Sequence, residues 1–135
     1  MIQIFSKVDG RLLHQIQRLN DIKNGRKDLS DPKEFLQMST LKLKKDTTFK
    51  PHKHIWHDIK PTAIAQESWV VIKGSVRCIF YDLDDTIIDE IILNPGDCSI
   101  TYFGGHNYYI EEDCIVLEIK TGPYFGVELD KKHIE

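Results

Sequence analysis

From about residue 35 onward, the sequence consists of short β-type runs separated by turn residues, which limits the chain to a mainly β fold. Turn signals lie at Lys73-Gly74, at Asn94-Pro95-Gly96-Asp97 and at Gly104-Gly105. The runs that are rich in β-branched and aromatic residues, or that alternate apolar with polar positions, are 67–72, 76–81, 86–93, 99–103, 108–110 and 115–120. Many short strands at such regular spacing predict a β-sandwich or a β-barrel.

A different periodicity precedes these runs. Between positions 11 and 23, apolar residues recur at three- and four-residue steps, at Leu12, Leu13, Ile16, Leu19 and Ile22. This stripe predicts one amphipathic helix over 11–23 that stops at Asn24-Gly25. We therefore expect an N-terminal extension with one helix at 1–35, a β-barrel over 36–129 and a C-terminal tail at 130–135.

Composition excludes several classes of protein. The chain has 135 residues, enough for one domain, and a net charge of −3 with acids and bases interleaved, which argues against nucleic acid as a partner. No window approaches the roughly 18 apolar residues of a membrane span. The N-terminus lacks the pattern of a secretory signal, and the three cysteines, Cys78, Cys98 and Cys114, form no CxxC pair. We expect buried thiols, no disulfide framework and a cytoplasmic location.

A histidine pair gives the first indication of chemistry. In Pro51-His52-Lys53-His54 the two histidines are two residues apart. On a strand, such residues point to the same face with Cα atoms about 6.5 Å apart, so both imidazoles can reach one ion at about 2.1 Å. The pair alone is weak evidence, because surface strands also carry such pairs.

Three later features strengthen the indication. Glu67 begins an apolar β-type run, where a carboxylate is costly to bury unless a cation or donor compensates it. Six residues separate it from Gly74. The turn at Asn94-Pro95-Gly96-Asp97 follows, and His106 comes ten residues after Gly96, where we expect a neighbouring strand.

This order of H-x-H, Glu, Gly, Pro-Gly-Asp and Gly-His resembles the two motifs of the cupin superfamily over about residues 48–119. The resemblance implies a single-domain cupin barrel, also called a double-stranded β-helix or jelly roll. It also implies that His52, His54, Glu67 and His106 bind one divalent transition metal. Such a mixed set of ligands suits Fe, Mn, Ni, Co or Zn and does not choose among them.

The sequence departs from the cupin pattern in one place. Twelve residues, Ile55 to Gln66, separate the histidine pair from Glu67, where cupins typically have three or four. The insertion contains His57 as a rival ligand, but an offset of three from His54 on a strand points to the opposite face. We expect the insertion, with Trp56, to form a lid or a dimer contact at the mouth of the barrel.

Further candidates for catalysis are Tyr102, Tyr108 and Glu118, besides His57. The tyrosine hydroxyls could donate to substrate oxygens or act as acids, although core packing is the alternative. Glu118 faces the barrel interior only if its strand has the expected register. His14 and His133 lie outside the β region and are expected at the surface.

The fold does not by itself determine the function. The resemblance implies a metal-dependent enzyme, an isomerase or a dioxygenase, that acts on a small oxygen-rich substrate such as a carbohydrate. The alternatives are a metal-free sugar-nucleotide ketoisomerase or epimerase, and a non-catalytic module that binds a small ligand. Because cupins often dimerise through N-terminal strands, we also expect a homodimer, formed by Met1–Phe5 or Leu36–Leu43.

Overall fold

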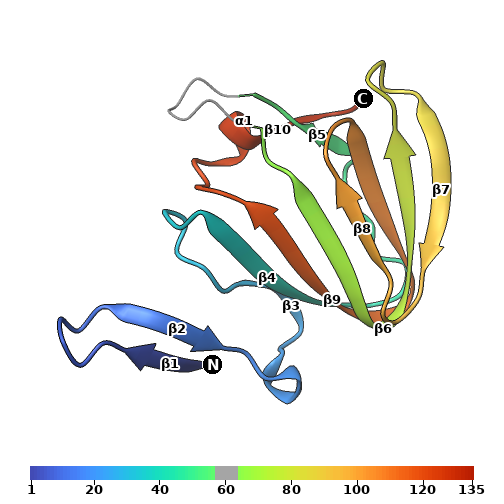
Figure 1. Cartoon of the computed structure of the whole chain (residues 1–135). Helices are drawn as coiled ribbons and strands as arrows, with labels where there is room; N and C mark the ends of the chain where they lie inside the picture. Colours follow the sequence, from blue (N-terminus) through green and yellow to red (C-terminus); the bar gives the residue numbers. More distant parts are fainter. Residues whose placement is uncertain (57–63) are drawn as a thin grey trace.

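The computed structural model describes residues 1–56 and 64–135, and antiparallel strands dominate it (Figure 1). The strands are β1 (Ile2–Phe5), β2 (Leu12–Ile16), β3 (Gly25–Asp28), β4 (Leu36–Leu43), β5 (His52–His54), β6 (Glu67–Tyr81), β7 (Ile87–Leu93), β8 (Cys98–Thr101), β9 (Gly105–Thr121) and β10 (Lys131–His133). Within the described ranges the helical elements are a 3-10 turn, η1 (Leu19–Asp21), and a short helix, α1 (Val127–Asp130). The predicted mainly β fold class is confirmed.

Eight of the strands form one curled sheet. Its path runs β10-β5-β9-β4-β3, and β6 joins it by pairing with β7, β8 and β9. The two strands β3 and β10 therefore belong to the sheet although they lie outside the 36–129 range expected for the barrel. No described helix is long and apolar enough to cross a membrane.

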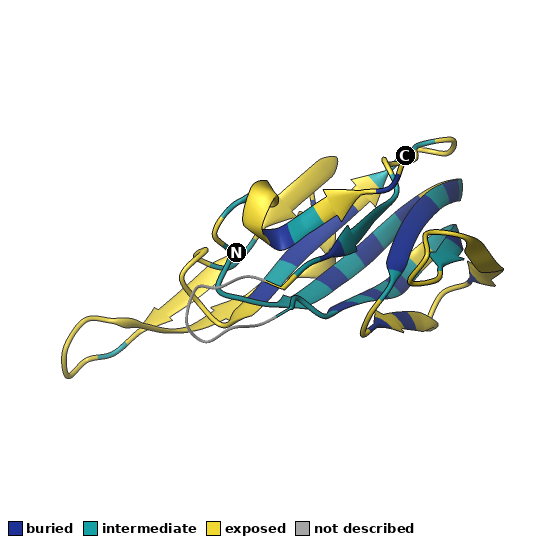
Figure 2. Ribbon diagram, turned by 90° about the horizontal axis from the view of Figure 1, so that it is seen from above, coloured by how far each residue is buried: buried dark blue, intermediate teal, exposed yellow. Residues whose placement is uncertain are grey.

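The core lies inside this curl. Along β6, and along β9 after its first four residues, which are all buried, buried residues mostly alternate with more exposed ones, as expected for strands with one face turned inward (Figure 2). The buried cluster comprises Leu41, Trp69, Val71, Val76, Cys78, Leu93, Tyr108, Ile110, Cys114 and Val116. The prediction of buried thiols is confirmed for Cys78 and Cys114 but wrong for Cys98, which is exposed at the start of β8.

The predicted turn at Lys73-Gly74 is wrong, because β6 continues through it to Tyr81. The strand bends there without reversing: its pairing with β9 shifts register three times between Val71 and Val76. Gly74 has a φ of +83°, and a Cβ added to it would clash with the carbonyl oxygen of Asp113. A glycine is needed here because β9 approaches too closely for any side chain.

Replacing Gly74 with alanine should destabilise the fold by at least about 2 kcal/mol more than the same change at Gly96. Both glycines have positive φ, but the space around Gly96 is open. The difference between the two losses of stability therefore separates the clash with β9 from the cost of placing alanine at a positive φ. The free energy of unfolding, measured in denaturant, checks this, and equal losses in the two variants would contradict the close approach of β6 and β9.

The helix predicted over 11–23 is also wrong. Leu12–Ile16 instead forms β2, which pairs antiparallel with β1 so that Ile16 lies opposite Ile2. The chain reverses through a turn in which the Ser6 amide donates to the Arg11 carbonyl and Gly10 has a φ of +78°. Pairing with the first residues of the chain therefore overrides the helical periodicity, and of the five stripe residues only Ile22 is buried.

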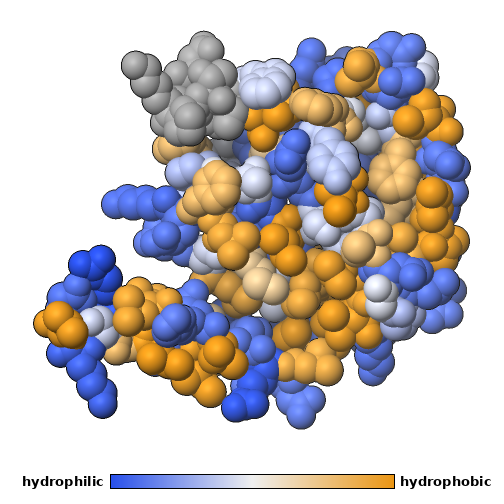
Figure 3. All heavy atoms as spheres, in the orientation of Figure 1, coloured by the Kyte–Doolittle hydropathy of each residue, from blue (hydrophilic) through white to orange (hydrophobic). Residues whose placement is uncertain are grey.

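The β1–β2 hairpin projects away from the barrel in Figures 1 and 2. Figure 3 shows hydrophobic side chains on this hairpin. Its exposed large apolar residues include Ile2, Ile4, Phe5, Leu12, Leu13 and Ile16. The homodimer through Met1–Phe5 stays a prediction. The Leu36–Leu43 segment is β4, which pairs along its whole length with β9 and over Ser39 to Lys42 with β3. A homodimer through this segment also stays a prediction.

Candidate metal centre

Three separate strands bring the predicted ligands together. His52 and His54 lie on β5, Glu67 is the first residue of β6, and His106 follows Gly105 at the start of β9. In the β5–β9 ladder, His52 lies directly opposite His106. One potential ligand atom from each of the four residues lies within 4.8 Å of all the others, so this cluster could hold a metal ion.

The distances between the ligand atoms suit one ion. The Nε2 atoms of His52 and His106 are 3.1 Å apart, and Nε2 of His54 lies 3.1 Å from Oε2 of Glu67. His106 Nε2 lies 3.6 Å from the other oxygen of Glu67. Adjacent ligands that bind one ion at about 2.1 Å lie roughly 3.0–3.4 Å apart. The cluster therefore fits a divalent ion after small movements of the side chains.

The far nitrogen of each imidazole also has a neighbouring acceptor. His52 Nδ1 donates to the Lys50 carbonyl at 3.2 Å, and His106 Nδ1 lies 2.9 Å from the Thr101 hydroxyl oxygen, to which it donates when Nε2 binds metal. His54 Nδ1 lies 3.3 Å from Oδ2 of Asp130, within ion-pair distance although not in hydrogen-bond geometry. Such partners orient the rings and leave Nε2 for a metal.

Electrostatics prepares most of the ligands for binding. Burial, with repulsion from neighbouring groups, lowers the pKa of His52 to about 3 and that of His106 to about 4, so both are neutral at pH 7. Burial also acts to lower the pKa of His54, but Asp130 and Glu67 outweigh it and raise that pKa to about 9. The pKa of Glu67 is lowered, because its contacts with the histidines outweigh its burial. A carboxylate and two neutral imidazoles therefore face the centre.

Asp130 contacts the ligand cluster at His54 and was not predicted from the sequence. It is the last residue of α1 and is buried, yet it lies in the segment expected to be a C-terminal tail. No motif or spacing marks it. The pairing of β10 with β5 brings it to the centre, placing Lys131 opposite His54.

The catalytic candidate Glu118 lies inside the barrel, but both of its oxygens are engaged. Arg26 donates to them at 2.7 and 3.0 Å, and Trp69 Nε1 donates to Oε2 at 3.1 Å. Arg26, which the sequence placed in the N-terminal extension, reaches this position from β3. The arrangement fixes one wall of the barrel.

The two candidate tyrosines lie in different surroundings. Tyr108 is buried and stacks on Trp69 with ring centroids 3.7 Å apart, and burial raises the pKa of its hydroxyl well above the usual value. Tyr102 is 57% exposed in the turn before β9. His57 and most of the Ile55–Gln66 insertion lie outside the described residues, and the described Trp56 is exposed.

A cavity of about 310 Å³ opens beside the centre. His52 and Glu67 line it, and Phe49, Trp69 and Tyr108 supply an aromatic wall. His133, expected at the surface, is exposed but also lines this cavity. A small molecule in this space would touch the ligand cluster directly.

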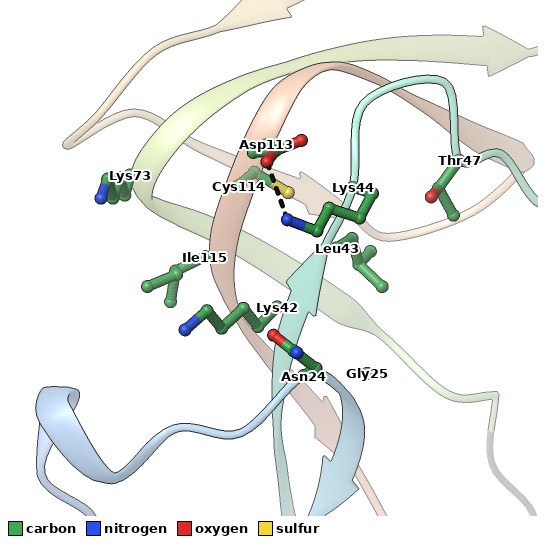
Figure 4. A pocket seen from close by; sticks show the side chains of 10 residues that line it. All are labelled: Asn24, Gly25, Lys42, Leu43, Lys44, Thr47, Lys73, Asp113, Cys114 and Ile115. Carbon is green, nitrogen blue, oxygen red and sulfur yellow. Dashed lines mark hydrogen bonds and ion pairs between the residues drawn. The ribbon is translucent and has the colours of Figure 1, made fainter.

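A second cavity, of about 430 Å³, lies elsewhere on the barrel (Figure 4). Lys42, Lys44 and Lys73 surround it, and Lys44 Nζ lies 3.1 Å from the carboxylate of Asp113. Lys73 is six residues along β6 from Glu67, or roughly 20 Å of extended strand. This cavity is therefore separate from the cluster of His52, His54, Glu67 and His106.

No protein-family model matches the sequence, and no curated protein matches it. Solved structures do resemble the fold. An uncharacterised protein with a double-stranded β-helix domain from Klebsiella pneumoniae superposes with a TM-score of 0.60 and 15% identity, over 87% of this chain and 90% of that one. An RmlC-like cupin protein from Desulfovibrio desulfuricans superposes with a TM-score of 0.57 and 13% identity, over 84% of this chain and 99% of that one. KdgF from Halomonas sp. superposes with a TM-score of 0.54 and 17% identity, over 90% of this chain and 94% of that one.

These likenesses and the strand pairing together define the fold class. The chain has the cupin fold, as the order of its motifs predicted. Within that fold, a His/Glu cluster that could hold a metal faces the barrel interior.

Proposed function

We propose that the protein binds one divalent transition metal through His52, His54, Glu67 and His106 and acts as a metal-dependent enzyme on a small, oxygen-rich substrate. The observation that carries the proposal is the convergence of four ligand atoms within 4.8 Å, beside a cavity of about 310 Å³. An isomerase or a dioxygenase acting on a carbohydrate fits the site best among the expected activities.

The residues of the chain have distinct tasks in this proposal. His52, His54, Glu67 and His106 hold the ion, which, when bound, supplies Lewis-acid polarisation of substrate oxygens or, if it is iron, O₂ activation. Four protein ligands leave up to two positions of a six-coordinate ion open toward the cavity. Trp69, Tyr108 and Phe49 keep bulk water from one side of the substrate, and Glu118 keeps the Trp69 ring in place.

Metal content tests the proposal. Protein purified without chelator, or reloaded with Fe, Mn, Ni, Co or Zn, should contain about one ion per chain by elemental analysis. The double variant His52→Ala, His54→Ala should lose it, and the control variant His14→Ala, on the exposed β1–β2 hairpin, should keep it. Wild-type protein that takes up none of the five metals would overturn the proposal.

Two alternatives make different predictions. A metal-free sugar-nucleotide ketoisomerase would use a histidine of the pair for proton transfer, and its activity would survive complete removal of metal. A module that only binds a ligand would be fully loaded with metal and yet turn over neither nucleotide sugars nor O₂. The burial of Glu67 among three histidines favours a metal site over metal-free proton transfer, and turnover separates the enzyme from a metal-loaded binding module.

A further inference from the structure

Strand β10 directs two basic side chains toward the metal centre. In its ladder with β5, Lys131 lies opposite His54 and His133 lies opposite His52. Residues directly opposite each other in an antiparallel pair share a face of the sheet. Because His52 and His54 point into the barrel, Lys131 and His133 do so too, and both line the cavity. Lys132, between them, is exposed and belongs to the other face.

Positive charge exceeds negative charge around this cavity. Three cationic side chains line it, Arg26, Lys50 and Lys131, against the two carboxylates Glu67 and Glu118. Arg26 and Glu118 neutralise each other through a two-point ion pair. Lys50 is exposed, so solvent screens its charge, whereas the Lys131 side chain is only 20% exposed. With the ion pair neutral and Lys50 screened, Lys131 and Glu67 balance each other. A bound divalent ion would therefore leave an excess of two positive charges beside the cavity.

Among the residues that the structure describes, Lys131 has one ion-pair partner, Asp130, and holds it loosely. Its Nζ lies 3.8 Å from Oδ2 of Asp130, which is too long for a hydrogen bond. Lys120 Nζ lies at the same distance from that oxygen, and His54 Nδ1 is nearer, at 3.3 Å. One carboxylate oxygen is thus shared among three nitrogen groups. The Lys131 ammonium keeps donors available for a further acceptor in the cavity.

We propose that the substrate of this centre is a small organic anion, which places one oxygen at the metal and its negative charge at Lys131. This inference rests on the proposed function and adds the chemical class of the substrate. Once the ion is bound, the half-buried excess of positive charge is costly without a counter-charge, and an anionic ligand supplies it whereas a neutral sugar does not. Charge-assisted hydrogen bonds from Lys131 then discriminate between acids and neutral polyols of the same size.

The test compares D-gluconate with D-glucitol, an anion and a neutral polyol of the same carbon skeleton, by calorimetry on the metal-loaded full chain. Wild-type protein should bind gluconate at least ten-fold more tightly than glucitol. Lys131→Met, which keeps most of the stem and removes the charge, should abolish that preference. Lys132→Met, the neighbouring residue on the other face, should leave it unchanged.

Elemental analysis of the same samples separates the possible failures. If the metal content is full and wild type binds both probes equally, or Lys131→Met keeps the preference, the anion inference is overturned and the metal site stands. If no metal is taken up, the proposed function is overturned and this inference with it. Full metal content in all three proteins, with the preference lost only in Lys131→Met, supports the assignment.

Discussion

Metal affinity should rise about ten-fold for each pH unit between pH 6 and pH 9 and level off above pH 9. The cause is His54, whose pKa is raised to about 9, so that its imidazole is protonated at neutral pH in the metal-free protein. A protonated imidazole cannot bind metal, and one proton must therefore leave. His52 and His106, with pKa values of about 3 and 4, and Glu67, with a lowered pKa, have already lost theirs.

The pH dependence is measured by competition for Zn²⁺ with a chelator of known protonation behaviour. Calorimetry in two buffers of different ionisation enthalpy gives the number of protons released, which should be close to one at pH 7. The variant His14→Gln, on the exposed hairpin, serves as the control and should keep the same slope. A flat profile between pH 6 and 9, or the release of two or more protons, would contradict the charge states described for the centre.

Replacing Asp130 with alanine should weaken metal binding by about 10–100-fold when proton competition is small. The Asp130 carboxylate lies 3.3 Å from His54 Nδ1 and holds the ring so that Nε2 faces Glu67. Without it, the ring is free to turn and the nitrogen is a weaker donor to metal. The same substitution removes a contact that raises the pKa of His54, so the inflection of the pH profile should also move below 9.

In Asp130→Ala, the loss of ring positioning weakens metal binding, whereas the lower pKa of His54 strengthens it at neutral pH. The metal affinities of the variants therefore have to be compared at about pH 9. Glu128→Gln is the matched control, because Glu128 lies two residues earlier in α1 and is exposed. It should change neither the affinity nor the inflection. An Asp130→Ala variant that keeps both, at unchanged thermal stability, would show that Asp130 does not position His54. Asp130→Asn, which keeps an acceptor oxygen, should fall between wild type and Asp130→Ala.

The parts of the centre that the sequence predicted are those marked by local spacing. His52 and His54 share a face because they are two apart on a strand. Glu67 and His106 were implied as further ligands by the resemblance of the order of turns and glycines to the cupin motifs. Likewise, the β-branched runs predicted most of the strands. The errors arose where a bend replaced a turn, as at Gly74, because register shifts in a ladder leave no mark in composition.

The features of the centre and the fold that could not be predicted from the sequence depend on pairing between distant segments. Asp130 and Lys131 reach the centre only because β10 pairs with β5, about 77 residues earlier in the chain. Arg26 contacts Glu118 across 92 residues. The 11–23 segment has a helical period, yet part of it forms a strand that pairs with the strand at Ile2–Phe5. Each of these outcomes is decided by tertiary contacts that outweigh local propensity.

The most direct test of the account is a crystal structure of the full chain loaded with Zn²⁺, with diffraction data collected on both sides of the zinc absorption edge. We predict one strong anomalous peak inside the barrel, about 2.0–2.2 Å from the Nε2 atoms of His52, His54 and His106 and from a carboxylate oxygen of Glu67. A barrel with no peak among these four side chains, or with zinc only at the surface, would contradict it.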